Sequence, residues 1–500
     1  MSTQAMRAGR VDGSSGELLP QATWRGRVFS SGWRELETST DVVEPATLQV
    51  VGRIGLASPG DIGRAVGLAR EAQSAWADLP YEERAAIFRR ASQLMQEHTA
   101  EISSWIMRES GGTRGKAAFE VGLALKALHE ASAMPSQPQG IVLPSQPDCV
   151  SIARRRPIGV VGVIAPFNFP LYLALRAVAP ALAVGNAVVL KPDPRTAVCG
   201  GVVIARIFQE AGLPEGVLHM LPGAADAGAA LCAHPQVGMI QFTGSSTAGR
   251  KVGELAGRNL KKVSLELGGK NSLIVLDDAD LDLAVSNAAW GAYLHQGQIC
   301  MASSRILVHR KLEKEFVAKL AEKAAGLPTG DPSTDENVVI GPLINQGQRD
   351  HIVSIVRDSI DAGARLETGG TYQKLFFRPT VLSQVKPGMR AFEEEIFGPV
   401  APVTAFDDDR EAVALANQTE YGLSGAILSS SVGRATALGR QLRTGLLHIN
   451  NQTIDDEVIN PFGGVGVSGN GTSIGGPANW DEFTQWQWMT IRDKAPARPI

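Results

Sequence analysis

The segment PIGVVGVIAPFNFPLYLAL, from Pro157 to Leu175, contains no charged residue over a length close to that of a membrane-spanning helix. Pro166, Asn168 and Pro170 interrupt it, and they divide it into a β-branched first part and a second part with helical character. A proline inside a helix removes a hydrogen bond and clashes with the preceding turn. The segment therefore predicts a buried strand, a tight turn and a helix, and we expect no membrane span.

Strand-like runs separated by helix-length stretches continue on the C-terminal side of this segment. Continuous apolar strands that alternate with helices are typical of a parallel sheet covered on both faces. Upstream, residues 58 to 130 repeat apolar side chains at helical spacing, after a helix-start pattern SPGD at Ser58–Asp61. The further strand-like runs are NAVVLKP (186–192), VLHMLPG (217–223), VGMIQFTG (237–244) and KKVSLELGG (261–269).

A second alternating series begins at SLIVLDDAD, residues 272 to 280, and has helical patterns after Asp280 and after Lys311. It ends near NPFGGVGVSGNG, residues 460 to 471. The predicted fold class is therefore α/β, with two doubly wound parallel-sheet domains. Two strand-like pieces, near 135–157 and 482–493, have no obvious place in either core. We expect them to form a small β arm that pairs with another subunit.

The composition excludes several classes of partner. The chain has 500 residues and a net charge of -3, without basic runs, so neither nucleic acid nor an anionic membrane surface is an expected partner. Its four cysteines lie far apart and match no metal-binding spacing, so we expect no metal and no disulfide framework. The first 20 residues lack the apolar core of a signal peptide, and a reducing, cytoplasmic location is expected.

Four loops follow predicted strands at the edge where open parallel sheets bind ligands. These are PFNFP, KPDP, TGSSTAG and ELGGK. In TGSSTAGRK, Gly244 and Gly249 bracket four residues as in a phosphate-binding loop, but Arg250 stands where that loop requires lysine. A strand, a small-residue turn and a helix N-terminus still suit an anion. An ordinary strand–helix turn is the alternative.

Three polar residues stand out within these loops, each with a structural alternative. Lys191 ends an apolar strand, where it is either solvated or directed at a ribose or phosphate. Asn168 lies in a rigid turn, either as a turn residue or as a donor toward developing negative charge. Glu266 follows an apolar strand, and burial there raises the pKa of a carboxyl group, as a general base requires. A structural salt bridge is the other interpretation for Glu266.

Cys300 lies in HQGQICMASS, among glutamines, a glycine and small polar residues. A structural cysteine more often lies among large apolar residues, whereas a reactive thiol needs access and space for substrate. His295 is five residues away, but neighbours in sequence rarely form a catalytic Cys–His pair. The surroundings therefore favour a reactive thiol.

Taken together, the loops resemble those of the NAD(P)-dependent, non-phosphorylating aldehyde dehydrogenase superfamily. PFNFP, KPDP, FTGSSTAG, LELGGKN, GQIC, EEEIFGPV and PFGGVGVSGNG occur in the order and approximate spacing of that family, from about residue 45 to 490. KPDPRTAVCGG and the tail WQWMT are most similar to the benzaldehyde dehydrogenase branch. Each motif alone is weak, but seven in order are specific.

The resemblance implies a role for each matching residue. Cys300 would be the nucleophile, Glu266 the base that activates water, and Asn168 the oxyanion donor. An NAD(P)-binding domain would comprise 1–134 and 155–266, a catalytic domain 267–460, and oligomerisation strands 135–154 and 480–500. The cofactor would contact Ile164, Lys191, Gly223, Gly244, Ser245, Gly249, Leu267, Glu395 and Phe397. Phe169, Tyr172, Leu173, Met301 and Phe462 would line the substrate pocket.

Two positions depart from the family pattern. Pro194 replaces the glutamate that grips the adenosine ribose in KPxE, so NAD is the expected cofactor but NADP becomes possible. Asp193 is adjacent, and its charge would repel a 2′-phosphate if it pointed inward. Ser473 stands where many relatives have an acid, which makes Glu266 the stronger candidate base.

The predicted function is oxidation of an aromatic, benzaldehyde-like aldehyde to the carboxylic acid, through a thiohemiacetal and a thioester on Cys300. An aliphatic aldehyde or semialdehyde is the alternative substrate, and Arg176 would favour a semialdehyde if it faced the pocket. A P-loop-like nucleotide hydrolase and a catalytically inactive structural relative are more distant alternatives. The expected partners are the aldehyde and further copies of the chain, as a homodimer or homotetramer.

Overall fold

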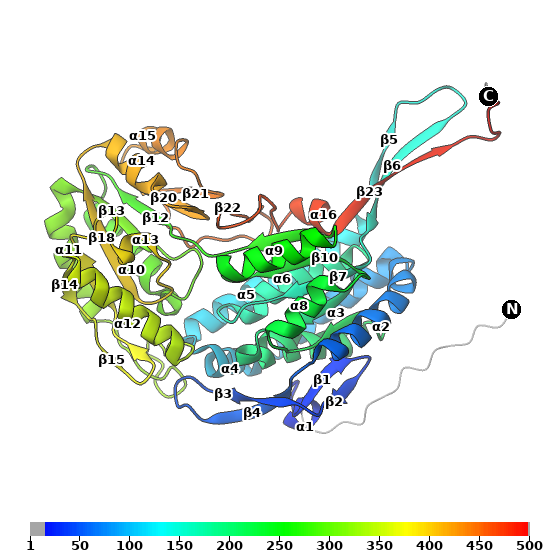
Figure 1. Cartoon of the computed structure of the whole chain (residues 1–500), viewed down its shortest axis with the longest axis horizontal. Helices are drawn as coiled ribbons and strands as arrows, with labels where there is room; N and C mark the ends of the chain where they lie inside the picture. The colour runs from blue at the N-terminus through cyan, green and yellow to red at the C-terminus, as the bar shows by residue number, and fades with distance from the viewer. Residues whose placement is uncertain (1–15, 499–500) are drawn as a thin grey trace.

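The computed structural model describes residues 16–498 and contains two large sheets and a projecting arm (Figure 1). The first sheet has the order β11-β10-β7-β8-β9-β1-β2. Five of its strands are parallel, and β1 and β2 extend one edge in antiparallel fashion. The strands are β1 (Arg27–Ser30), β2 (Trp33–Glu35), β7 (Val160–Ile164), β8 (Ala187–Lys191), β9 (Leu218–Met220), β10 (Val237–Thr243) and β11 (Lys262–Glu266).

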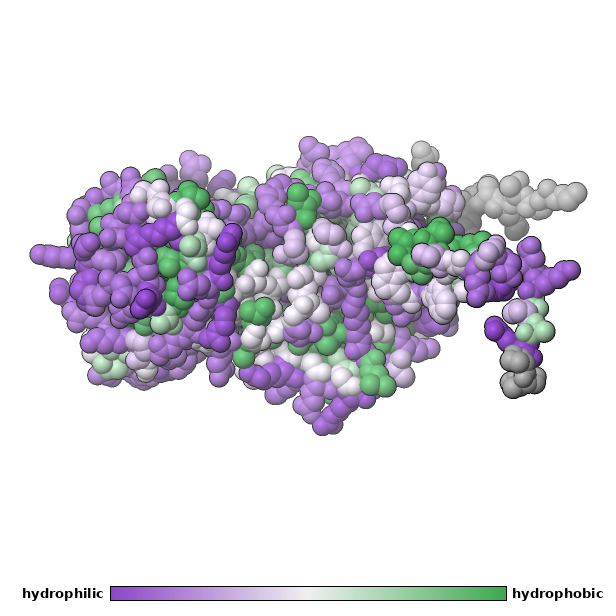
Figure 2. Space-filling model, turned by 90° about the horizontal axis from the view of Figure 1, so that it is seen from above, coloured by the Kyte–Doolittle hydropathy of each residue, from purple (hydrophilic) through white to green (hydrophobic). Residues whose placement is uncertain are grey.

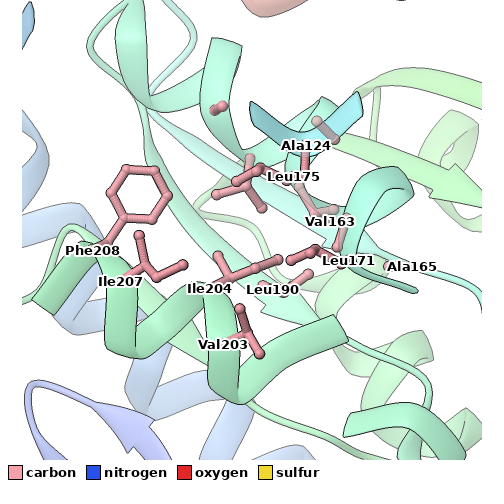
Figure 3. Close-up of a cluster of buried hydrophobic side chains, with 14 of the residues drawn as sticks. Ala124, Val163, Ala165, Leu171, Leu175, Leu190, Val203, Ile204, Ile207 and Phe208 are labelled. Atoms are coloured by element: carbon pink, nitrogen blue, oxygen red, sulfur yellow. The ribbon is translucent and has the colours of Figure 1, made fainter. Parts of the chain in front are cut away.

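Helices cover both faces of this sheet. Alternate residues of its strands point to opposite faces, and both faces carry apolar side chains that the helices bury. Val161 and Val163 of β7 belong to the larger core, whereas Val160 and Ile164 belong to the core on the other face. The larger core is drawn in Figure 3, where Leu171 and Leu175 pack toward Ile204 and Phe208. The helices of this half are α1 (Gln21–Trp24), α2 (Pro59–Ala77), α3 (Tyr81–Glu97), α4 (Thr99–Ser110), α5 (Arg114–Ala133), α6 (Pro170–Ala183), α7 (Val203–Glu210), α8 (Ala225–Ala233) and α9 (Ser246–Arg258), with 3-10 turns at Met134–Ser136 and Pro194–Thr196 and a π-helix at Val198–Val202.

The sequence predictions for this half are confirmed in two respects. All five predicted parallel strands form, and the charge-free segment divides into β7 and α6 rather than one helix. The helix-start pattern at Ser58–Asp61 is a capping box at the N-terminus of α2: Ser58 accepts a hydrogen bond from the Asp61 N–H, and Asp61 accepts one from the Ser58 N–H. Within residues 16–498, no helix combines the length and apolar character that crossing a membrane requires.

The second sheet has the order β14-β17-β18-β13-β12-β20-β21 and is parallel except for β14. Its two faces pack in separate cores, as the prediction of a second doubly wound domain requires. The strands are β12 (Ser272–Val275), β13 (Arg305–His309), β14 (Arg365–Thr368), β17 (Thr380–Ser383), β18 (Val400–Phe406), β20 (Ser424–Leu428) and β21 (Leu446–Ile449); the helices are α10 (Leu281–Tyr293), α11 (Arg310–Ala325), α12 (Gln346–Asp361), α13 (Arg390–Glu393), α14 (Asp409–Asn417) and α15 (Val432–Gly439), with a 3-10 turn at Leu294–Gly297.

The two strand-like pieces outside both cores form the arm, which projects from the body in Figure 1. β5 (Gly140–Leu143), β6 (Val150–Pro157) and β23 (Thr484–Ile491) make an antiparallel sheet in the order β23-β6-β5, preceded by α16 (Ala478–Phe483). The pieces thus pair with each other inside one chain. Trp488 and Val142 are 71% and 77% exposed, and Figure 2 shows hydrophobic side chains gathered at this end of the molecule.

Three small two-stranded antiparallel sheets complete the fold: β3 (Ser39–Val43) with β4 (Val50–Gly55), β15 (Tyr372–Gln373) with β16 (Phe376–Phe377), and β19 (Tyr421–Gly422) with β22 (Val465–Gly466). The prediction that the N-terminus lacks a signal peptide concerns residues 1–20, of which 1–15 lie outside the described range. Residues 1–15 and 499–500 of the predicted domain ranges also lie outside it.

Candidate active site

Two cavities meet at Cys300, between the C-terminal ends of the strands of the first sheet and the N-terminal ends of strands of the second. A wide cavity of about 480 Å³ and a narrow apolar pocket share Asn168, Leu173, Thr243, Leu267 and Cys300 in their walls. Asn168 and Leu267 come from loops after strands of the first sheet, whereas Cys300 precedes β13 of the second. Parallel sheets bind ligands at the C-terminal ends of their strands, which is the edge that the first sheet presents to these cavities. The junction is therefore the candidate active site.

The turn that carries Asn168 is anchored by a buried ion pair on α5. Glu120 accepts hydrogen bonds from the N–H groups of Leu171 (2.9 Å) and Tyr172 (3.2 Å) in the first turn of α6, and it pairs with Lys116. Both charged side chains are fully buried, and the Lys116 ammonium lies 4.4 Å from the centre of the Phe169 ring. The first N–H groups of a helix lack partners within the helix. Glu120 provides the acceptor that the residues at the start of α6 do not.

Asn168 itself is 3% exposed, and its Nδ2 donates to the carbonyl oxygen of Gln298 at 3.0 Å. A primary amide carries two N–H groups. One therefore fixes the side chain against the Cys300 loop, and the second remains to serve as a donor in the cavity that Asn168 lines.

The loop before Cys300 has a strained backbone held from several sides. His295, Gln296 and Gly297 have φ values of 47°, 57° and 65°, a left-handed run that costs free energy for residues other than glycine. Gln296 Nε2 donates to the carbonyl oxygen of Gly111 at 2.7 Å, and Gln298 Oε1 accepts from the Ile344 N–H at 3.0 Å. These bonds fix the loop in its unusual conformation.

A side-chain amide from the second sheet fixes the nucleophile position itself. Asn271 Nδ2 donates to the carbonyl oxygens of Cys300 (2.7 Å) and Ala302 (2.9 Å), while its Oδ1 accepts from the Ser424 N–H (2.9 Å). A Cβ atom on Gly269 would clash with the Cys300 carbonyl oxygen, so only glycine fits there. The sequence motif LELGGKN contains both residues, but their function as supports of the Cys300 loop was not predictable from it.

His295 does not pair with Cys300. Its buried ring packs edge-to-face on Phe169 at 5.6 Å, and neither ring nitrogen has a hydrogen-bond partner in the described chain. Burial and the neighbouring Lys116 charge hold the pKa of His295 well below its ordinary value, so the imidazole is neutral. The thiol has no histidine base, as the sequence spacing indicated.

The Cys300 thiol and the Glu266 carboxyl group both favour their protonated forms. Burial, followed by the charges of Glu395 and Glu266, raises the pKa of Cys300 to about 12. Glu266 ends β11 with both carboxyl oxygens buried and without a hydrogen-bond partner in residues 16–498. Burial raises the pKa of Glu266 well above its ordinary value, and only Arg176 opposes this. Glu266 thus has the high proton affinity of a general base, and no protein donor occupies either of its oxygens.

The wide cavity contains most of the predicted cofactor residues. Its walls include Ile164, Lys191, Gly244, Ser245, Leu267, Glu395 and Phe397. Gly223 and Gly249 do not line it. Gly249 instead allows α9 to pack closely on Leu267, because a Cβ atom there would clash with that side chain, and Gly223 forms a β-bridge with Ala57.

The wide cavity is also lined by residues that sequence reasoning did not assign to it, among them Phe167, Asp193, Arg195, Gln348 and His351. Asp193 and Arg195 directly follow Lys191 in the chain, so their position was a usable signal. Gln348 and His351 belong to α12 of the other half, and nothing in their local sequence relates them to this cavity.

The wide cavity has the chemistry that a dinucleotide requires. Ser245 is the N-cap of α9, a 13-residue helix whose N-terminus attracts phosphate, and Lys191 adds a positive charge. Glu395 accepts a hydrogen bond from the Gly269 N–H at 2.9 Å, and burial raises its pKa to about 7. A Cβ atom on Gly268 would clash with the Glu395 carboxyl group. The absence of a side chain at Gly268 thus leaves room for Glu395 to face the cavity.

The narrow pocket is apolar near Cys300 and includes all five predicted substrate-pocket residues: Phe169, Tyr172, Leu173, Met301 and Phe462. Phe119, Ile299, Ile454 and Ile474 extend the apolar wall. Arg176 also lines the pocket, but it forms an ion pair with Asp456 and donates to the Ile474 carbonyl oxygen at 3.0 Å. Asp456 was not predicted as a site residue, because only the fold brings it opposite Arg176.

Known proteins identify the family to which this arrangement belongs. Residues 33–489 match the model of the aldehyde dehydrogenase family. The chain is 54% identical to the vanillin dehydrogenase of Amycolatopsis sp. over 97% of its own length and 100% of that protein. It is 49% identical to the NAD+-dependent benzaldehyde dehydrogenase of Pseudomonas putida, again over 97% of this chain and 100% of that one.

The structural comparison agrees with the sequence comparison. Betaine aldehyde dehydrogenase of Staphylococcus aureus, solved in complex with NAD+, superposes with a TM-score of 0.92 at 29% identity, covering 96% of this chain and 97% of that one. The chain belongs to the aldehyde dehydrogenase family, and it is an NAD(P)-dependent enzyme that oxidises an aldehyde.

The raised pKa of Cys300 predicts slow alkylation of the free enzyme. At pH 7 we expect iodoacetamide to modify Cys300 more slowly than the partly exposed Cys149, with a rate that increases as the pH rises, because only the thiolate reacts. Glu395→Gln should accelerate the reaction of Cys300 by removing a negative charge, without affecting Cys149. Mass spectrometry of the two peptides over time measures both rates. Faster modification of Cys300 than of Cys149 at pH 7 would contradict this prediction.

Proposed function

We propose that this aldehyde dehydrogenase oxidises aromatic aldehydes of the benzaldehyde type to carboxylic acids, with Cys300, Asn168 and Glu266 as catalytic residues. The observation that carries the proposal is the position of Cys300 at the junction between a wide polar cavity and a narrow pocket with aromatic and aliphatic walls. The names of the two similar enzymes, a vanillin and a benzaldehyde dehydrogenase, support an aromatic substrate.

In the first half of the reaction the Cys300 thiolate attacks the aldehyde carbon and forms a thiohemiacetal. The second N–H of the Asn168 amide and the Cys300 backbone N–H stabilise the oxyanion that develops on the aldehyde oxygen. A donor of this kind contributes about 3 kcal/mol to transition-state stabilisation. When bound, the oxidised nicotinamide supplies a positive charge near the thiol and accepts the hydride. The thiohemiacetal then becomes a thioester on Cys300.

In the second half Glu266 removes a proton from water, which attacks the thioester and releases the carboxylic acid. The unpartnered carboxyl oxygens of Glu266 suit this function, because no protein donor competes with the water. Since burial raises its pKa, Glu266 must lose a proton before it can act as a base. The hydrolysis rate should therefore increase with pH until Glu266 is ionised.

The pocket argues against the alternative substrates. A semialdehyde carries a carboxylate in addition to its formyl group, and Arg176, which would bind that carboxylate, is already paired with Asp456. A small aliphatic aldehyde would leave much of the wall formed by Phe119, Phe169 and Phe462 without contacts. Turnover of a substrate panel separates these classes from aromatic aldehydes.

Variants of the three proposed catalytic residues should fail in different ways with benzaldehyde. Cys300→Ala should form no reduced nicotinamide. Glu266→Gln should form about one equivalent per active site in a burst and then stop, with an acylated Cys300 detectable by mass spectrometry, because acylation precedes water activation. Asn168→Ala should lower kcat about 100-fold or more. Stopped-flow absorbance measures all three, with the surface variant Glu254→Gln as control. Steady turnover by Cys300→Ala would exclude these assignments. Steady turnover by Glu266→Gln with no acyl adduct on Cys300 would exclude them as well.

We further propose that the enzyme prefers NAD to NADP, with Asp193 as the determinant. Asp193 lines the wide cavity two residues after Lys191, where Pro194 offers no carboxylate of its own. Burial alone would raise the pKa of Asp193, but its hydrogen bonds and charge interaction with Arg195 outweigh burial and lower the pKa. Asp193 is therefore ionised at neutral pH. Its negative charge would repel a 2′-phosphate, while Arg195, paired with it at 2.6 Å, weakens that repulsion.

Removal of the Asp193 charge should shift the preference toward NADP. In Asp193→Asn we expect the ratio of kcat/KM for NAD to that for NADP to fall roughly tenfold, which corresponds to about 1.4 kcal/mol. Asp335→Asn, an equal charge change in an exposed loop, should leave the ratio as in the wild type. Initial rates with each cofactor provide the ratios. An unchanged ratio in Asp193→Asn would assign the preference to another residue.

We also propose that the arm assembles the chain into a homodimer or homotetramer. β5 and β23 have outer edges without a partner strand in the described chain, and exposed apolar side chains lie along the arm. Sedimentation equilibrium should give a mass of two or four times 53.0 kDa. Trp488→Glu should lower that mass, whereas Leu260→Glu, at an exposed position outside the arm, should not. A wild-type monomer would exclude the proposal.

A further inference from the structure

A polar cluster interrupts the apolar wall of the narrow pocket. It consists of Tyr172 and Arg176 on α6 and Asp456 in the loop after β21, and all three residues line the pocket. The Tyr172 hydroxyl donates to Asp456 Oδ2 at 2.9 Å, and Arg176 Nη1 pairs with the same oxygen. The Arg176 and Asp456 side chains are only 4% and 8% exposed. We refer to these three residues as the Asp456 cluster.

The Asp456 cluster has hydrogen-bonding capacity that the protein does not use. Both partners of Asp456 contact Oδ2, and within residues 16–498 Oδ1 accepts no hydrogen bond. Arg176 Nε is buried without a partner there, whereas Asp456 Oδ1 is not fully buried and Asp456 lines the pocket. Buried polar groups in proteins are normally paired, and an unpaired one costs about 1–3 kcal/mol. An unused acceptor beside an apolar pocket therefore indicates a ligand that donates a hydrogen bond.

The packing of the cluster keeps the unused acceptor in place. The Arg176 guanidinium lies 4.6 Å from the centre of the Phe462 ring and 5.6 Å from that of Tyr172, so aromatic faces hold it on two sides. Desolvation raises the pKa of Tyr172, and its hydroxyl remains a donor to Asp456. A carboxylate fixed by two donors on one oxygen presents the other in a defined direction.

The proposed reaction uses none of these three residues. Cys300 and Asn168 line both cavities and Glu266 lines the narrow pocket beside them, whereas the Asp456 cluster has no part in the proposed chemistry. The charge of Asp456 nevertheless contributes, after burial and the charges of Glu395 and Glu266, to the raised pKa of Cys300. The cluster is therefore near enough to the thiol to contact a substrate that is attached there.

We propose that Asp456 Oδ1 accepts a hydrogen bond from a hydroxyl group on the ring of the substrate, which makes Asp456 a specificity-determining residue for hydroxylated aromatic aldehydes. The inference rests on the proposed function, because it requires an aromatic aldehyde with its formyl group at Cys300. A hydroxyl at the opposite end of the ring donates to Oδ1. A methyl group in the same place leaves the carboxylate oxygen unpaired. A site built for a hydroxyl discriminates against an analogue that lacks it.

Three aldehydes of similar shape test this proposal. 4-Hydroxybenzaldehyde donates a hydrogen bond, 4-methoxybenzaldehyde only accepts one, and 4-methylbenzaldehyde does neither. With saturating NAD we expect wild-type kcat/KM for the hydroxyl compound to exceed that for the methyl compound about tenfold or more, as for a hydrogen bond to a charged group. The methoxy compound should resemble the methyl compound. If the methoxy compound instead equalled the hydroxyl compound, Arg176 Nε would be the recognition group and the proposal would be overturned.

Variants locate the discrimination. The hydroxyl-to-methyl ratio of kcat/KM should fall toward one in Asp456→Asn and in the double variant Arg176→Met/Asp456→Leu. The double variant removes both charges together, since a single unpaired buried charge destabilises the fold. Asp455→Asn is the matched control: its carboxylate is half exposed, does not line the pocket, and its loss should leave the ratio unchanged.

The readouts separate this proposal from the proposed function. Turnover of benzaldehyde with a wild-type hydroxyl-to-methyl ratio near one overturns the role of Asp456 alone. A high ratio that persists in both Asp456 variants does the same. Absence of turnover with benzaldehyde and with all three analogues overturns the aromatic assignment, and this inference with it. The wild-type ratio requires no variant, so the proposal is tested even if a substitution prevents folding.

Discussion

The buried Lys116–Glu120 pair determines the geometry on which the rest of the site depends. Glu120 completes the hydrogen bonding at the start of α6, and Lys116 lies against Phe169 in the preceding turn. α6 then carries Tyr172 and Arg176, and the turn carries Asn168. Breaking a buried pair of this kind costs about 3–5 kcal/mol, because one charge remains uncompensated. The orientation of the proposed oxyanion donor and of one pocket wall is thus set by two side chains on α5 that do not themselves line the pocket.

The active site contains several acids that hold their protons in the free enzyme. Burial is the largest cause of the raised pKa values of Cys300, Glu266 and Glu395, and the charges of Glu395 and Glu266 raise the pKa of Cys300 further. Groups that favour the neutral form allow a low-polarity site to exist without buried charge. The reaction nevertheless needs a thiolate and later a carboxylate. In the free enzyme at neutral pH the Cys300 thiol is mostly uncharged.

Most of the framework of this site was predictable from the sequence, and the failures share one cause. Strand periodicity located β7, β8, β10 and β11, and the motif order located Cys300, Asn168 and Glu266 beside one another. The predictions failed where contacts are distant in the sequence. Asp456 is 280 residues from Arg176, and Gln348 and His351 reach the wide cavity from the other half of the molecule. Gly223 and Gly249 were expected at the cofactor but do not line the wide cavity. A glycine after a strand can serve either ligand binding or close packing, and the local sequence does not distinguish the two uses.

Asn271 has a consequence for how the two halves work together. It ties the Cys300 loop to β20 of the second sheet, whereas Asn168 and Glu266 belong to the first. The Asn168–Gln298 hydrogen bond is a direct link between them. The thiol and the two groups proposed to assist it are therefore held by different sheets. Their alignment depends on the contacts that join the two halves of the chain as well as on the residues themselves.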